Sequence, residues 1–458
     1  MAILPESSLK VAEDVSRVSP PPGSVPTTAL PLVFFDIQYL GSSPFQRLFF
    51  YEFPHPSSYF CQTTLPSLKT SLSLALQRFF PYAGNLVFPP PPQIPYILYT
   101  EGDSLSLFVN ESAADFTHLA GNHARHFQEF QPLLPKLPPA VPSGGSIQKT
   151  PLMAVQVTLF PNQGISIGLS FCHVVSDGRT LAHFMKTWAS LHRSQVPDQP
   201  PPDFDSRSLI EDPLGLASLF MNRDWSFDNL SSNPIDKLQV TYNIKKSQVE
   251  FLKDLARKSC TEDKEPEPAI RISTFVVTCA YMWVCLTKLQ NMSHSDSDSD
   301  ELSYFLFTVD CRRHLKLPAT YFGNCAIART VAAKRSELIG EDGFVVAAKA
   351  IGREVMELEK GALEGIGTAR GDKFKTGQVP IMVGSSPRFN LYEVDFGWGR
   401  PRKTEVASLG SLVFLFLFSI AESREEEDEG GIEFGLAFAP HELDSFNAIM
   451  DSGFLKLS

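Results

Sequence analysis

The sequence predicts a mixed α/β protein of two domains, and three observations lead to this prediction. A chain of 458 residues is too long for one ordinary hydrophobic core. Strand-like and helix-like hydrophobic patterns follow one another along the chain. Residues 196–206 are rich in Pro and Asp, which is typical of a linker. We therefore expect an N-terminal domain over residues 1–205, a crossover linker over 206–240 and a C-terminal domain over 241–458.

In the N-terminal half, apolar spacing predicts one helix and a hairpin. Apolar residues recur at helical spacing over residues 68–80, and Pro81 ends that helix. Two alternating runs, 155–159 and 165–171, flank a Pro-Asn-Gln-Gly turn and so predict paired strands. A lead-in strand and a Pro-rich loop are expected within residues 5–30.

In the C-terminal half, the patterns predict a buried helix over residues 275–286 and a strand over 304–309. A second strand, over 412–420, is expected to pair with 432–438 across an acidic hairpin tip. Residues 293–301 alternate Ser and Asp, which predicts a surface loop.

Composition and charge restrict the partners and the cellular location that the protein can have. The net charge of −11 argues against a nucleic-acid partner, which would need a basic surface. The seven cysteines are an odd number without a C-x-x-C pair, so we expect buried free thiols. No signal peptide is expected, and the longest apolar run, residues 412–418, is too short to cross a bilayer. We therefore expect a soluble protein of the cytosol.

The most informative motif is His173 with Asp177 and Gly178, an H-x-x-x-D-G pattern. It follows the predicted strand over 165–171 and precedes a helical apolar pattern over 181–191. A tight loop between strand and helix fixes a histidine at the end of a sheet, where neutral imidazole can act as a general base near pH 7. The alternative is a loop histidine without a catalytic role, followed by an aspartate that caps the helix.

A second motif, D-F-G-W-G at residues 395–399, supports a catalytic role for the first. H-x-x-x-D-G in mid-chain followed by D-F-G-W-G resembles the double signature of the BAHD acyltransferases, plant enzymes that move an acyl group from coenzyme A to an alcohol or amine. Y-F-G-N-C at residues 321–325 resembles the branch that acylates sugars on anthocyanins, flavonoids and other phenolic glycosides. Further similar stretches lie at residues 32–36, 80–86 and 273–278.

The resemblance implies two chloramphenicol-acetyltransferase-like α/β domains with a solvent channel between them. Acyl-coenzyme A would enter from one side as a co-substrate, with no permanently bound cofactor, and a glycosylated phenolic acceptor from the other, with His173 midway. The implied reaction is transfer of a malonyl or hydroxycinnamoyl group, such as coumaroyl, to a sugar hydroxyl. A monomer is expected, because the channel lies within one chain. No nucleic-acid or membrane partner is expected.

The resemblance makes His173 the general base of a direct transfer through a ternary complex. Asp177 has two interpretations: it orients the imidazole as in a triad, or it turns away and pairs with an arginine to hold the loop. The resemblance favours the second, with Arg312 as a structural partner. His314 stands where the family usually has another arginine, which puts that contact in doubt. Gly178 is expected to be structural.

Asp395 is expected to support its motif together with Trp398 rather than to act as a second acid or base, because the neighbouring glycines predict a tight turn. Five residues are expected to bind coenzyme A, of which Ser273 has a second interpretation as a helix N-cap. They are Ser273, Thr274, Gly397, Arg402 and Lys403.

Two arginines are candidate substrate-binding residues. Arg388 lies seven residues before Asp395, and in related enzymes an arginine at that spacing can hold an acceptor carboxylate. Ser386 replaces a Trp that many members carry, which indicates a different acceptor pocket. Arg179 could hold the carboxylate of malonyl-coenzyme A, although a solvent-facing residue of the first helical turn is the alternative.

Two other functions are alternatives. A zinc hydrolase could use His173 and Asp177 as ligands, but it needs further ligands, and His183 is accompanied by no H-E-x-x-H or C-x-x-C pattern. No metal site is therefore predicted. A pseudoenzyme that binds acyl-coenzyme A or a phenolic ligand without turnover is the second alternative.

Overall fold

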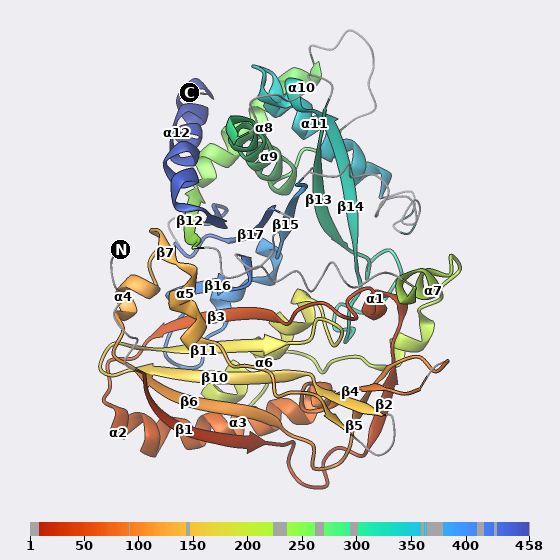
Figure 1. Ribbon diagram of the computed structural model, residues 1–458, viewed down its shortest axis with the longest axis vertical. Coiled ribbons are helices and arrows are strands. Elements are labelled where there is room, and N and C mark those ends of the chain that lie inside the picture. Colours follow the sequence, from red (N-terminus) through yellow and green to blue (C-terminus); the bar gives the residue numbers. More distant parts are fainter. Residues whose placement is uncertain are drawn as a thin grey trace. The chain divides into compact units, whose positions relative to one another are not determined.

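The protein forms two compact units (Figure 1). The computed structural model describes residues 9–90, 92–142, 147–222, 236–261, 270–293, 301–358, 361, 363, 379–409, 416–425 and 428–457. The first unit contains Met1–Leu230, Leu315–Cys325 and Phe389–Ser408. The second unit contains Ser231–His314, Ala326–Arg388 and Leu409–Ser458.

A six-stranded sheet is the centre of the first unit. β10 pairs with β11 in antiparallel register from Met153↔Phe171 to Phe160↔Gly164, which confirms the predicted hairpin. Asn162 in its turn adopts φ +60, a left-handed conformation that Asn tolerates. The strands, in sheet order, are β1 (Leu9–Val18), β6 (Leu105–Ser112), β10 (Met153–Phe160), β11 (Gly164–Phe171), β3 (Phe45–Glu52) and β16 (Lys403–Val406).

Small residues let another segment of the chain approach one face of β11 closely. The predicted alternation is correct for a strand, but every residue from Gly164 to Phe171 is buried. A Cβ added to Gly168 would lie 2.2 Å from the Leu133 carbonyl oxygen. Ser170 Oγ donates to the carbonyl of Pro135 at 2.6 Å. The alternation therefore reflects close backbone packing rather than a solvent-facing side.

The first unit also contains a second sheet, of five strands. Its order is β2 (Thr28–Pro31), β5 (Tyr96–Tyr99), β4 (Asn85–Phe88), β9 (Gln148–Pro151) and β8 (Val141–Pro142), all antiparallel. The unit also contains β7 (Arg125–His126) and the helices α1 (Phe34–Ile37), α2 (Ser57–Tyr59), α3 (Leu65–Arg78), α4 (Phe116–Leu119), α5 (Phe127–Phe130), α6 (Gly178–Ser194) and α7 (Leu216–Met221).

The two long helices of the first unit, α3 and α6, pack against each other (Figure 1). The predicted helix at residues 68–80 is confirmed as α3, which ends at Arg78. Trp188 of α6 is completely buried, and its Nε1 donates to Ser71 Oγ of α3 at 3.2 Å. This contact anchors the helix that directly follows the His173 motif.

The second unit has its own mixed sheet and an apolar helix at its core. Strands β14 (Ala326–Lys334), β13 (Leu302–Asp310), β15 (Ile381–Gly384), β17 (Phe416–Glu422), β18 (Ile432–Phe438) and β12 (Leu238–Ile244) lie in this order. The helices are α8 (Lys246–Thr261), α9 (Thr274–Ser293), α10 (Arg335–Ile339), α11 (Gly343–Glu357) and α12 (Pro440–Leu457). Trp283 of α9 stacks on Phe305 of β13 with ring centroids 5.5 Å apart.

The elements predicted for the C-terminal half are confirmed where the structure describes them. The buried helix is α9, the strand at 304–309 is β13, and β17 pairs with β18 in an antiparallel hairpin. Residues 412–415 and most of the predicted Ser-Asp loop, 294–300, lie outside the described residues.

The observed division into two units differs from the predicted division of the chain at a single linker. Residues 315–325 and 389–408, which carry two motifs expected in the C-terminal domain, pack within the first unit. The reason is strand pairing, because β16 is bonded to β3 and Tyr321 forms a bridge to Asp203. The predicted channel concerns the placement of the two units and stays a prediction. Among the described helices, none has the length and apolarity needed to span a bilayer.

Candidate active site

His173 lies on the loop between β11 and α6, here called the His173 loop (residues 172–177). Its imidazole stacks on the ring of Tyr39, with centroids 3.8 Å apart and an interplanar angle of 12°. Phe45 of β3 meets the imidazole edge-on at 5.9 Å. The side chain is half-buried, so part of it is open to solvent. Two aromatic rings therefore fix the plane of the imidazole and leave a way for a substrate to reach it.

The surroundings of His173 favour the neutral imidazole. Burial lowers the pKa of His173, and the nearby polar groups, among them the Asp177 carboxylate, oppose this effect only in part. Nδ1 is enclosed and has no hydrogen-bond partner among the described residues. Nε2 is therefore the nitrogen through which the ring can meet a proton donor. An unprotonated Nε2 at neutral pH is what a general base requires.

Asp177 holds the ends of the His173 loop in place. Its Oδ1 accepts a hydrogen bond from the N–H of Thr180 at 2.9 Å, which makes it the N-cap of α6. Its Oδ2 accepts from the N–H of Cys325 at 3.1 Å. These contacts support the loop-holding interpretation of Asp177. Arg312 is buried in the second unit, where it pairs with Asp310 at 3.1 Å, so the Asp177–Arg312 pair stays a prediction.

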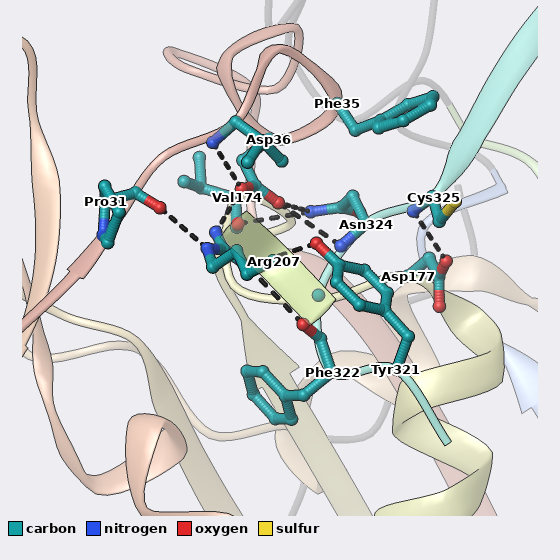
Figure 2. Close-up of polar contacts among 12 residues, drawn as sticks. Pro31, Phe35, Asp36, Val174, Asp177, Arg207, Tyr321, Phe322, Asn324 and Cys325 are labelled. Atoms are coloured by element: carbon teal, nitrogen blue, oxygen red, sulfur yellow. Dashed lines mark hydrogen bonds and ion pairs between the residues drawn. The ribbon is translucent and has the colours of Figure 1, made fainter. Parts of the chain in front are cut away.

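Asn324 binds the backbone of the His173 loop (Figure 2). Its Nδ2 donates to the carbonyl oxygens of His173, at 2.9 Å, and Val174, at 3.1 Å. Thr180 Oγ1 donates to the carbonyl of Gly323 at 3.0 Å. The Y-F-G-N-C segment is therefore bonded to both sides of the loop that carries the histidine.

A buried ion pair lies behind Asn324. Asp36 Oδ1 accepts from Asn324 Nδ2 at 3.0 Å, and its Oδ2 pairs with the guanidinium of Arg207 (Figure 2). Residues 32–36 and 321–325 stand out in the sequence only for their resemblance to the family, which by itself indicates no role for these side chains. Arg207 gave no signal at all, because it lies in the predicted linker.

The D-F-G-W-G residues form a tight turn, here called the DFGWG turn (residues 395–399). Asp395 Oδ1 accepts hydrogen bonds from the N–H groups of Gly397 at 2.7 Å and Gly399 at 2.9 Å. Both glycines have left-handed φ angles, +94 and +88. Arg193 of α6 donates to the carbonyl of Asp395 at 3.1 Å. These contacts support a structural role for Asp395.

Aromatic contacts attach the DFGWG turn to the first unit. Trp398 packs on Tyr51 of β3 and on Phe53, which directly follows that strand, with centroids 5.5 and 5.8 Å away. His192 of α6 lies 2.7 Å from the Phe396 carbonyl through Nδ1. The turn therefore connects β3 with the far end of the helix that follows His173.

The two basic residues predicted to bind coenzyme A, Arg402 and Lys403, are engaged with side chains of the protein. Arg402 pairs with Glu52 at 2.8 Å. Lys403 is 2% exposed and donates to Asn122 Oδ1 at 2.8 Å. Because a buried ammonium cannot reach a ligand in solvent, this placement argues against the predicted contact of Lys403 with coenzyme A.

Three of the other predicted binding residues lie in the second unit, so their relation to His173 stays a prediction. Ser273 Oγ accepts from the N–H of Val276 at 3.3 Å, which confirms its N-cap position before α9, and Thr274 begins that helix. Arg388 is exposed in a short 3₁₀ turn.

The remaining predicted residues lie at the start of α6. A Cβ on Gly178 would approach the Phe389 ring to 2.7 Å, so the close contact requires glycine. Arg179 is exposed in the first helical turn. Exposure is compatible with both interpretations given for Arg179.

The rival chemistries gain no support from the site. Burial raises the pKa of the Cys172 thiol to about 11, so it stays protonated and weakly nucleophilic. His183 Nε2 is 2.8 Å from the carbonyl of Pro200. Among the residues that the structure describes, no group of three or more His, Cys, Asp or Glu could hold a metal ion.

Comparison with known families decides the class of protein. The model of the Transferase family matches residues 10–452, almost the whole chain. The chain belongs to this family. The resemblance to the BAHD acyltransferases is thereby confirmed, together with the mixed α/β fold and the expectation of an acyltransferase that uses acyl-coenzyme A as co-substrate.

Characterised relatives of this BAHD transferase use different donors. A coumaroyl-CoA:anthocyanidin 3-O-glucoside-6''-O-coumaroyltransferase of Arabidopsis thaliana is 35% identical, over 97% of each chain. A malonyl-coenzyme A:anthocyanin 3-O-glucoside-6''-O-malonyltransferase of Dahlia pinnata is 36% identical, over 96% of each chain. Overall identity therefore does not separate the two donors.

A solved structure agrees on the fold of this BAHD transferase. The crystal structure of vinorine synthase superposes with a TM-score of 0.64 at 19% identity, and the match covers 95% of both chains. At that identity the likeness supports the fold alone.

Proposed function

We propose that this BAHD transferase moves a malonyl or hydroxycinnamoyl group from coenzyme A to a sugar hydroxyl of a flavonoid, anthocyanin or other phenolic glucoside, with His173 as general base. The observation that carries the proposal is the half-buried imidazole of His173, whose pKa burial lowers, between two aromatic rings. Both relatives named above act on anthocyanidin or anthocyanin glucosides, which supports this acceptor class.

The proton transfer follows from the state of the imidazole. His173 Nε2 removes the hydroxyl proton as the sugar oxygen attacks the thioester carbonyl carbon. A C–O bond forms, the C–S bond then breaks, and the coenzyme A thiolate takes the proton back from the imidazolium. A positioned base of this kind contributes on the order of 10²- to 10⁴-fold in rate.

Direct transfer requires no covalent intermediate on the protein. The nearest thiol to His173 in sequence, Cys172, stays protonated near neutral pH because burial raises its pKa to about 11. A ternary complex of enzyme, acyl-coenzyme A and glucoside is therefore the proposed reactive state. Initial rates measured at several concentrations of both substrates should give intersecting rather than parallel double-reciprocal lines.

The choice of donor has one candidate determinant. Arg179 is exposed in the first turn of α6, six residues after His173 in sequence. A guanidinium there could pair with the free carboxylate of malonyl-coenzyme A, which a coumaroyl group lacks. Arg179→Ala should therefore raise the KM for malonyl-coenzyme A and leave that for coumaroyl-coenzyme A unchanged.

The first test is acyl transfer itself. The purified enzyme, His173→Ala and His183→Ala are incubated with malonyl-CoA and separately with coumaroyl-CoA, with flavonoid and simple phenolic glucosides as acceptors. His183 is the matched control, because it lies on the adjoining helix and contacts the Pro200 carbonyl. Mass spectrometry should find product from the wild type and His183→Ala only.

Each other outcome has a defined meaning. Undiminished product from His173→Ala would refute the base assignment. If the wild type gives no product with any pair, binding of coenzyme A measured by calorimetry distinguishes a non-catalytic acyl-CoA-binding protein from a wrong choice of substrates. Light scattering and a fluorescent fusion in plant cells test two further parts of the proposal, a monomeric state and a cytosolic location.

A further inference from the structure

A buried ion pair underlies the His173 loop. Asp36, from α1, and Arg207, from the 3₁₀ turn Asp205–Leu209, have side chains that are 0% and 4% exposed. Taking two charges out of water is costly unless their remaining donors and acceptors are also satisfied. The hydrogen bonds of this pair satisfy the buried donors and acceptors and connect the pair to the His173 loop.

Arg207 uses its planar group to contact two other segments of the chain, residues 31–36 and 321–322 (Figure 2). Its Nε donates to the carbonyl of Pro31 at 2.7 Å. Its Nη1 lies 3.4 Å from both Tyr321 Oη and the carbonyl of Phe322. Its Nη2 pairs with Asp36 Oδ2. A lysine has a single ammonium and could not span these acceptors.

Asp36 connects Arg207 to Asn324 through hydrogen bonds. Asp36 Oδ2 also accepts from the N–H of Val33 at 3.0 Å, so both of its oxygens are occupied. Oδ1 accepts from the backbone N–H of Asn324 at 3.2 Å and from its Nδ2 at 3.0 Å. Two bonds to one carboxylate oxygen fix both the main chain and the amide plane of Asn324.

Asn324 then fixes the carbonyls of the His173 loop. The same Nδ2 that meets Asp36 lies 2.9 Å from the carbonyl oxygen of His173 and 3.1 Å from that of Val174. Rotation of this amide would place an oxygen against acceptor oxygens. The orientation of one side chain therefore sets the path of the backbone that presents the imidazole.

We propose that Asp36 and Arg207 are positioning residues for His173, which act through the amide of Asn324. The proposal rests on the proposed function, in which His173 is the base. A displacement of about 1 Å at a reacting group can cost on the order of 10²-fold in rate. Such a loss affects the transition state and leaves substrate binding unchanged, so it lowers kcat rather than raising KM.

The chain offers a matched control. Arg125 and Glu405 form another buried pair of the first unit, 2.8 Å apart, with side chains 0% and 2% exposed. The other guanidinium nitrogens of Arg125 donate to the carbonyls of Leu119 and His123. Breaking this pair should lower the folding stability, as breaking the Asp36–Arg207 pair does. It should leave the position of the His173 loop unchanged.

The experiment compares Asp36→Asn with Glu405→Gln, at a temperature where thermal melting shows both folded. In Asp36→Asn the new amide puts a donor against the Val33 N–H and Arg207. We expect kcat to fall about 10²-fold in Asp36→Asn, with little change in either KM, and to stay near wild type in Glu405→Gln. Arg207→Lys keeps the charge and should show a smaller fall, which keeps the test open if Asp36→Asn does not fold.

A double-variant cycle tests the route through Asn324. If Asp36 acts through that amide, Asp36→Asn combined with Asn324→Ala should lose no more kcat than Asn324→Ala alone. Independent effects would multiply, and that result would overturn the proposal. So would an unchanged kcat in Asp36→Asn and Arg207→Lys, or an equal loss in Glu405→Gln.

The two proposals fail in different ways. If His173→Ala retains full activity, the base assignment itself is refuted. If His173→Ala is inactive but the Asp36 and Arg207 variants behave like Glu405→Gln, only the positioning role is refuted.

Discussion

Replacing Asp395 by Asn and by Ala separates a structural carboxylate from a catalytic one. Asp395 Oδ1 accepts two backbone hydrogen bonds in the DFGWG turn, from Gly397 and Gly399. Hydrogen bonds to a charged acceptor contribute about 1.5–3 kcal/mol each. The side chain is 31% exposed, so the lower end applies, and the Ala variant should lose about 3 kcal/mol of folding free energy.

The Asn variant keeps the acceptor that the turn needs. Its amide oxygen can receive both N–H groups at the strength of neutral hydrogen bonds, so we expect a loss of only about 1 kcal/mol. If Asp395 has a structural role only, the kcat of the Asn variant stays close to that of the wild type. A proton-transferring Asp395 would instead make Asn and Ala equally inactive, by about 10²- to 10⁴-fold.

The assay combines chemical denaturation with steady-state acyl transfer on the same preparations. Stability should rank wild type, Asn, then Ala, and activity at a temperature where all three are folded should follow the same order. An Asn variant with near-normal stability and the full loss of kcat would refute the structural interpretation.

Three further predictions follow from the same structure. Because burial lowers the pKa of His173, the acid limb of kcat/KM against pH should have its midpoint below 6.5, with activity lost as the imidazole is protonated; a midpoint above 6.5 would contradict this. Cys172→Ser should retain acyl transfer in the same assay, because the thiol pKa of about 11 leaves no thiolate to lose. Gly397→Ala should lower the melting temperature by the equivalent of about 1–3 kcal/mol, because its φ is +94 while the nearest atom to the new Cβ is 3.7 Å away; an unchanged melting temperature would show that the turn relaxes.

Local patterns predicted the local part of the site. The strand before His173 and the helix after it follow from apolar spacing, and the cap made by Asp177 follows from its place before that helix. These features depend on neighbours in the sequence, so a single chain contains enough information to predict them.

The contacts between distant segments could not be predicted in this way. Arg207 reads as part of a polar linker, yet it is buried, because its partners come from residues 31–36 and 321–322. Lys403 looks like a solvated cation, yet it lies inside the first unit, because β16 adds to the edge of β3. Hydrophobic spacing contains no information about pairing across several hundred residues.

The addition of β16 to β3 has a consequence for synthesis of the chain. On the ribosome, β3 can pair with β11 early, but its other edge has no partner until β16 has emerged. At about 5–20 residues per second, the stretch from residue 231 to residue 406 takes on the order of ten to thirty-five seconds. During that interval the nascent N-terminal half exposes an open strand edge, a surface that promotes aggregation. Expression of that half alone would make this transient state permanent.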